Sequence, residues 1–161
     1  MLNRQNKMKI RKKEWELILP VSLEELWDFF SVPDNLNKMT PEQAGFRMIS
    51  TLNGQKIFPG MLIEHEVSPI LGIPLYWVTE IIHVDKPHTF IDKQLIGPYA
   101  LWHHQHTFIS HEKGVLMVDT LHYRVGMGLL GTIANSLFVE KKINDIFDFR
   151  RRAAINLFGK A

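Results

Sequence analysis

The residues best suited to acid–base or metal chemistry are the eight histidines, three of which lie close together in the sequence. His103, His104 and His106 belong to a segment, 99–110, whose aromatic and β-branched residues predict a strand. Because side chains alternate along a strand, His104 and His106 share one face with Trp102, and His103 points the other way. We therefore treat His104 and His106 as a pair on one face of a sheet.

An acidic residue on the next predicted strand, 114–125, offers this pair a partner. Asp119 is the one acid on a face that is otherwise apolar. A carboxylate on an inward face is costly unless it is paired or hydrogen-bonded. We predict that Asp119 lies on the concave face of the sheet and contacts His106 or another histidine.

The register of the hairpin decides which residue faces Asp119. A two-residue loop at 112–113 places His106 opposite Asp119. A three-residue turn with a bulged glycine places Thr107 there instead. We favour the two-residue loop, because it also places Trp102 on the apolar face of its strand.

A fourth histidine, His65, is also flanked by apolar residues at alternate positions. Three histidines and an aspartate suit zinc, iron or copper. Their positions are scattered, however, and the chain has no cysteine and no H-E-x-x-H helix, so we expect no metal site and no cofactor.

A His–Asp pair without a serine or cysteine nucleophile is no triad. It can still act as a general base, which makes His106 and Asp119 the candidate catalytic residues.

The elements that must position these residues begin with a first strand, predicted over residues 8–19. A Ser-x-x-Glu capping box then starts a short helix at 23–30, and a second short helix is predicted over 33–39. Apolar residues at helical spacing predict one long helix over 129–157. Between them, Gly, Pro and Asn turns separate six more predicted strands, at 44–51, 60–68, 73–85, 88–96, 99–110 and 114–125.

Consecutive strands joined by short turns form an antiparallel sheet, and the lack of intervening helices excludes a parallel doubly wound fold. The predicted fold class is α+β: a seven-stranded curved antiparallel sheet wrapped around a long C-terminal helix, with two short helices between strands 1 and 2. Such a sheet leaves an internal cavity unless large side chains fill it. We expect residues 1–161 to form one domain, with 1–7 flexible.

Several short phrases along the predicted elements are distinctive. The most specific runs from Gly97-Pro98-Tyr99 into Trp102-His103-His104-Gln105-His106-Thr107-Phe108. Others are Pro33-Asp34-Asn35-Leu36 with Met39-Thr40-Pro41, Trp77 with Glu80-Ile81, and Phe90-Ile91-Asp92-Lys93-Gln94. Together with the order of elements, they resemble the START-like, or SRPBCC, superfamily with its helix-grip fold, and in particular a bacterial ligand-binding SRPBCC family.

The resemblance implies binding of a small molecule in a cavity between the sheet and the C-terminal helix. Aromatic walls with a few polar groups fit such a site. The first hypothesis is binding of a small hydrophobic or amphipathic ligand. The alternative is a cyclase or dehydratase, since the superfamily includes polyketide cyclases, with cavity His and Asp as general acid and base. The expected ligand-binding residues are His65, Trp77, Trp102, His104, His106, Asp119 and Tyr123.

The segment 126–131 reads G-x-G-x-x-G, the fingerprint of dinucleotide-binding folds. In those folds a second parallel strand ending in an acid follows about 20 residues later. Here only the final helix follows, so we interpret the glycines as a hinge. Met127, Leu129 and Leu130 form either a mobile gate at this hinge or its ordinary packing.

The net charge is only +2, so we expect no nucleic-acid partner. Basic residues cluster at 4–13 and 150–152, which fits a solvated strand face and a helix end. A partner-binding or membrane-surface role for these clusters is the least favoured hypothesis. No stretch has the roughly 18 apolar residues of a membrane helix. We therefore expect a cytoplasmic protein with no integral membrane segment.

Overall fold

The computed structural model describes residues 9–68, 72–126 and 136–161. Every predicted element is present, and apart from the second strand the strand ends differ from prediction by at most three residues. In chain order the elements are β1 (Arg11–Leu19), α2 (Leu23–Phe30), η1 (Pro33–Asn35), α3 (Leu36–Met39), η2 (Glu42–Ala44), β2 (Arg47–Met48), β3 (Leu62–Val67), β4 (Leu75–Asp85), β5 (Thr89–Ile96), β6 (Tyr99–His111), β7 (Gly114–Val125) and α5 (Ser136–Phe158).

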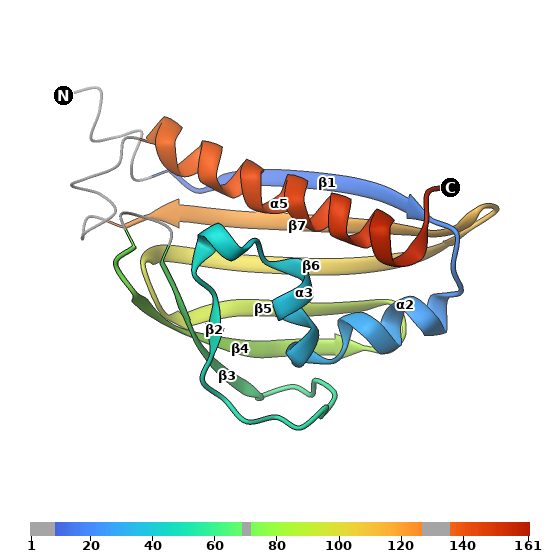
Figure 1. Ribbon diagram of the computed structural model, residues 1–161, viewed down its shortest axis with the longest axis horizontal. Coiled ribbons are helices and arrows are strands. Elements are labelled where there is room, and N and C mark those ends of the chain that lie inside the picture. The colour runs from blue at the N-terminus through green and yellow to red at the C-terminus, as the bar shows by residue number, and fades with distance from the viewer. Residues whose placement is uncertain (1–8, 69–71, 127–135) are drawn as a thin grey trace.

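The seven strands form one antiparallel sheet in the order β1-β7-β6-β5-β4-β3-β2. The strands from β2 to β7 pair with their neighbours in the chain, and β1 pairs with β7 at one edge. In Figure 1, α2, α3 and α5 lie on the same face of the sheet, with α5 alongside β1 and β7. The predicted fold class is confirmed.

The second strand is much shorter than predicted. The predicted segment 44–51 contributes only the two residues of β2. The amides of Ile49 and Ser50 both donate to the Glu64 carbonyl oxygen, and Ser50 Oγ accepts from the Glu64 amide at 2.8 Å. The Glu64 amide thus donates to the Ser50 hydroxyl oxygen instead of to a backbone carbonyl oxygen of β2. The pairing of β2 with β3 ends there.

The long helix agrees with prediction at its C-terminal end, where Phe158 is followed by Gly159 with a φ of 90°. The predicted first part of this helix, 129–135, lies outside the described residues. So do Met127, Leu129 and Leu130 of the predicted gate. Gly126, which follows β7, is the described glycine of the G-x-G-x-x-G motif.

The core lies between the sheet and these helices. Every second residue of β7 from Val115 to Val125 is buried. Met117 belongs to an apolar cluster that includes residues of α2, and Leu121 to a second cluster against α5. Asp119 lies between them along the strand, so it is a polar residue at the junction of two apolar clusters.

The basic residues of β1 are partly neutralised by acids. Arg11 Nη1 lies 3.0 Å from Glu140 Oε2, and Lys13 contacts the same carboxylate, which ties α5 to the edge strand. Lys12 lies 2.8 Å from Glu14.

Among the described residues, we find no helix with the length and apolar character needed to cross a membrane.

Candidate functional site

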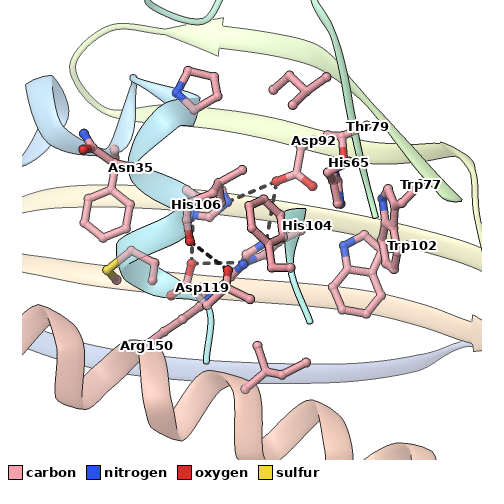
Figure 2. Close-up of a pocket in the computed structure, with 18 of the residues that line it drawn as sticks. Asn35, His65, Trp77, Thr79, Asp92, Trp102, His104, His106, Asp119 and Arg150 are labelled. Atoms are coloured by element: carbon pink, nitrogen blue, oxygen red, sulfur yellow. Dashed lines mark hydrogen bonds and ion pairs between the residues drawn. The ribbon is translucent and has the colours of Figure 1, made fainter. Parts of the chain in front are cut away.

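A pocket of about 170 Å³ lies between the sheet, α5 and the short helices α2 and α3 (Figure 2). A cavity of about 150 Å³ accommodates benzene, so this pocket suits a molecule with one or two rings. Its wall is largely apolar, with contributions from Phe30, Ile63, Ile81, Phe90, Met117 and Phe147.

Six of the seven residues predicted to bind a ligand line this pocket. They are His65, Trp77, Trp102, His104, His106 and Asp119. In Figure 2 the two tryptophans and His65 lie toward one end of the pocket, and the other three surround its polar part. These six predicted residues therefore lie around the same pocket.

Tyr123 is the predicted residue that does not line the pocket. It is fully buried in the apolar cluster against α5, with its ring centre 6.4 Å from that of Tyr99. Its hydroxyl has no hydrogen-bond partner among the described residues. Tyr123 shares a strand face with Asp119, but it lies further along β7, where α5 covers the sheet.

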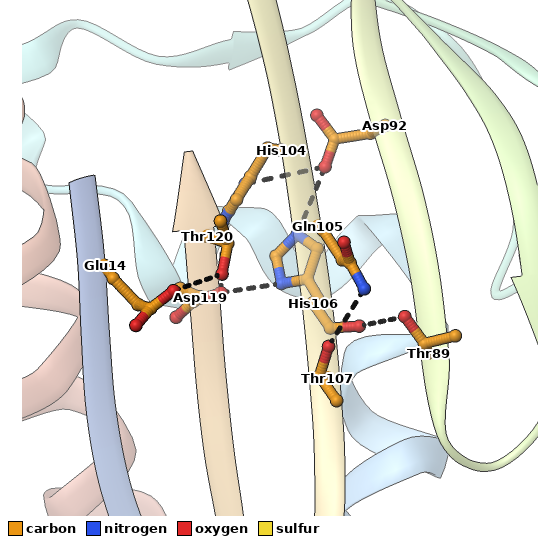
Figure 3. Close-up of polar contacts among 9 residues, drawn as sticks. All are labelled: Glu14, Thr89, Asp92, His104, Gln105, His106, Thr107, Asp119 and Thr120. Carbon is orange, nitrogen blue, oxygen red and sulfur yellow. Dashed lines mark hydrogen bonds and ion pairs between the residues drawn. The ribbon is translucent and has the colours of Figure 1, made fainter. Parts of the chain in front are cut away.

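Four polar side chains form a closed ring in the pocket, which we call the polar ring: Asp92, His104, His106 and Asp119 (Figure 3). Asp119 Oδ1 lies 3.1 Å from His104 Nε2 and 2.9 Å from His106 Nδ1. Asp92 Oδ2 lies 3.1 Å from His106 Nε2 and 3.5 Å from His104 Nδ1. Each imidazole thus has one nitrogen near Asp92 and the other near Asp119. The geometry at His106 Nδ1 does not make a hydrogen bond. The predicted contact between Asp119 and a histidine is confirmed.

The register of the sheet brings the polar ring together. His104 and His106 project from the same face of β6. Asp92 lies opposite His104 on β5, and Asp119 lies opposite His106 on β7. His111 pairs with Gly114, so the loop is the two-residue one and the favoured register is confirmed.

Burial and opposite charges compete within the polar ring. Burial opposes a charge on His106, but Asp119 and Asp92 outweigh it and raise its pKa. For His104, burial and the nearby charge of His106 lower the pKa despite the two carboxylates. Burial alone would raise the pKa of both carboxyl groups, but the histidines hold the pKa of Asp119 and of Asp92 below the usual range. The two aspartates thus favour a proton on His106 over one on His104.

Comparison with known proteins identifies the architecture. No protein-family model and no curated protein matches the chain. A START superfamily protein from Mycobacterium smegmatis has a TM-score of 0.65 and 14% identity, covering 92% of this chain and 96% of its own. The chain has the START-like helix-grip fold.

Two further structures share this helix-grip fold. A protein from Chromobacterium violaceum has a TM-score of 0.67 and 11% identity, covering 94% of this chain and 99% of its own. The di-domain ARO/CYC StfQ from the steffimycin biosynthetic pathway has a TM-score of 0.66 and 11% identity over 96% of this chain, which spans 51% of StfQ. At these identities the likeness concerns the fold alone. The narrower bacterial SRPBCC family remains a resemblance.

Arg150 also lines the pocket of this helix-grip protein, whereas the sequence pattern predicts it in a solvated cluster at a helix end. It reaches from α5 toward Asp119 in Figure 2, and its guanidinium carbon lies 5.2 Å from the centre of the Phe147 ring. Nε of Arg150 is buried and has no hydrogen-bond partner among the described residues. Burial lowers the pKa of Arg150 while both aspartates oppose the shift, and an arginine stays charged. Its positive charge opposes the negative charges of Asp92 and Asp119.

Asp92 was likewise not selected as a site residue. It lies two residues after the buried Phe90, and strand alternation from Phe90 is the signal that could have placed it inside. For Arg150 the corresponding signal is its position three residues after Phe147 on one helix. Its neighbours Arg151 and Arg152 are exposed, as expected for a solvated cluster.

His65 lines the other end of the pocket. Its ring centre lies 5.7 Å from that of Trp77 and 5.2 Å from that of Phe46. Burial lowers the pKa of His65 to about 4, with Arg150 adding to the shift and Asp92 opposing it. Its Nδ1 has no hydrogen-bond partner among the described residues, so a neutral imidazole borders the pocket with an unused polar atom.

Proposed function

We propose that this protein binds a small, mainly apolar molecule carrying one polar or anionic group, held between the sheet and α5. The observation that supports this is the apolar pocket with three buried nitrogens, His65 Nδ1, His106 Nδ1 and Arg150 Nε, that have no hydrogen-bond partner among the described residues. A buried polar group without a partner costs about 1–3 kcal/mol. A bound polar group removes that cost, and the guanidinium favours an anionic one.

A binding assay with ligands of graded size and charge tests the proposal. Benzoate and benzyl alcohol fit a pocket of about 170 Å³, whereas a long-chain fatty acid exceeds it. We expect both ring compounds to raise the melting temperature with concentration and to give saturable heats in calorimetry. The fatty acid is expected to give neither. Failure of all ring compounds to bind would overturn the proposal.

Matched variants place the binding in the pocket. Thr79 lines the pocket, so Thr79→Phe is expected to abolish the thermal shift. Thr107 lies on the other face of β6, so Thr107→Phe is its control and keeps the shift. Arg150→Gln is expected to weaken benzoate roughly tenfold more than benzyl alcohol, because a charge-assisted hydrogen bond is worth about 1.5–3 kcal/mol.

The alternative remains a cyclase or dehydratase in which His106 and Asp119 move protons. In the polar ring both nitrogens of each histidine already face carboxylates at 2.9–3.5 Å. A substrate would therefore have to compete with a carboxylate at each of these imidazole nitrogens. The likeness to StfQ concerns the fold, so binding is the function that the geometry supports better.

A further inference from the structure

Three atoms of the polar ring lie at the spacing of metal ligands. Asp92 Oδ2 is 3.1 Å from His106 Nε2 and 3.5 Å from His104 Nδ1. One possible ligand atom from each of the three residues lies within 4.8 Å of the other two. Ligands of a tetrahedral zinc ion, with bonds of about 2.0–2.2 Å, sit roughly 3.4 Å apart. One cation can therefore replace the contacts among these atoms with little movement.

The opposite side of the ring has the partner that metal-binding histidines need. A histidine that binds a metal through one nitrogen usually donates its other N–H to a carboxylate. Asp119 Oδ1 lies 3.1 Å from His104 Nε2 and 2.9 Å from His106 Nδ1. One carboxylate thus faces the remaining nitrogen of both histidines, which would fix their tautomers and ring orientations.

Three neighbouring strands hold these residues. The two histidines come from one face of β6, and each aspartate lies directly opposite one of them on an adjacent strand. The side chains of His104, His106 and Asp92 are 3%, 9% and 14% exposed. Sites built on strands are held more firmly than sites on loops. The remaining coordination positions would face the pocket that these residues line.

We propose that Asp92, His104 and His106 bind one divalent first-row transition metal ion, with Asp119 orienting both imidazoles. Two imidazoles and one carboxylate suit Zn²⁺, Fe²⁺ or Co²⁺ rather than Mg²⁺ or Ca²⁺. The inference departs from the sequence-based expectation of no metal, which did not include Asp92. It does not depend on the proposed organic ligand.

Metal titration of the full chain tests the proposal without any organic ligand. Protein stripped with a chelator is titrated with Co²⁺ and, by competition with a chromophoric chelator, with Zn²⁺. We expect visible Co²⁺ absorption bands that saturate at one ion per chain, and a melting temperature that rises with Zn²⁺. Asp92→Asn and His106→Gln are expected to weaken Zn²⁺ binding at least tenfold. Asp119→Asn is expected to weaken it about 10–100-fold through the loss of ligand orientation.

A second histidine pair provides the control for surface binding. His103 and His122 lie on the other face of the sheet, with ring centres 6.1 Å apart. The double variant His103→Gln/His122→Gln is expected to bind Zn²⁺ as the wild type does. Loss of binding in this variant, or no stoichiometric metal on the wild-type protein, overturns the proposal.

A measurement on the wild type covers the case in which the ring variants do not fold. Zn²⁺ is expected to shift the imidazole NMR signals of His104 and His106 and to leave those of His103 and His122 in place. The reverse pattern, or no shift, contradicts the proposed site. Because benzoate is absent here and metal is absent from the ligand assay, failure of one proposal is distinguishable from failure of the other.

Discussion

Asp119 lies close to both histidines of the polar ring, because one of its oxygens is 3.1 Å from His104 Nε2 and 2.9 Å from His106 Nδ1. It is buried, and so are both histidines. Removing one partner of a buried ion pair leaves an uncompensated charge and typically costs about 3–5 kcal/mol. The ring should therefore respond to substitution as one unit.

We predict that Asp119→Asn lowers the free energy of unfolding by about 3 kcal/mol, measured by urea denaturation with a chelator present. His106→Gln should also destabilise the protein. The double variant should lose less than the sum of the two, with a coupling of about 1–3 kcal/mol. Additive losses would show that the two side chains do not interact in solution.

His65 should make stability depend on pH. The pKa of His65 in the fold is about 4, below the ordinary value of 6.5, so the fold keeps it neutral while the unfolded chain takes up a proton. This contribution is complete above pH 6.5 and is lost as pH falls toward 4. Between pH 7 and pH 5 we expect the wild type to lose roughly 2 kcal/mol more than His65→Gln in urea denaturation. Parallel pH profiles would contradict the buried, neutral state of His65.

A site residue was predictable when its neighbours on one strand or hairpin were enough to place it. Alternation along one strand and a short hairpin loop sufficed to place Asp119 against a histidine. Asp92 and Arg150 required more, because the other pocket walls had to be known before an acid of β5 or a cation of α5 could be placed beside the histidines. The position of Tyr123 outside the pocket lining has the same cause, since strand alternation does not show where a helix covers the sheet.

At the scale of elements, polar side chains in the distinctive sequence segments form hydrogen bonds with the backbone between elements. Gln94 Nε2 donates to the Tyr99 carbonyl oxygen at 2.7 Å, and its Oε1 accepts from the Tyr99 amide at 3.1 Å. These bonds close the turn between β5 and β6. Asn35 Nδ2 donates to the Phe29 carbonyl oxygen at 2.9 Å, which joins α2 to the following short helices. The phrases thus shape the turns and the pocket roof.

The start of β7 should not tolerate a side chain at Gly114. Its φ is 126°, and a Cβ there would lie 2.1 Å from the Leu19 carbonyl oxygen. We predict that Gly114→Ala costs roughly 3 kcal/mol or more of unfolding free energy, because backbone must shift. Gly60→Ala is the matched control: its φ is 88°, no atom lies within 4 Å of the added Cβ, and the expected cost is about 1 kcal/mol. Equal losses in thermal denaturation would contradict the close approach of β1 and β7.

Element positions were predictable where turn chemistry is strong. Glycine, proline and the capping box marked most strand and helix ends to within a few residues. The end of β2 was not predictable in this way, because it depends on the Ser50 side chain bonding to the Glu64 amide of a neighbouring strand. That competition between a side chain and the ladder becomes visible only when both strands are placed.

At the scale of the whole molecule, the pocket joins distant parts of the chain. Its roof comes from α2, α3 and α5, and its floor from the sheet. We predict that benzoate slows amide hydrogen exchange in these three helices more than in the edge strand β1, because a bound ligand links roof to floor. Exchange measured by mass spectrometry tests this, with Thr79→Phe as the variant that shows no slowing. Uniform slowing over the whole chain would contradict binding at this place.

The polar ring is confined to three consecutive strands, from Asp92 on β5 to Asp119 on β7. Short loops close at low entropic cost, so contacts of this kind form early in folding. The docking of α5 on β1 instead unites the two ends of the chain, with Glu140 meeting Arg11. We therefore expect the nascent sheet to carry an assembled ring before the pocket has its roof, so that folding itself passes through an open form of the site.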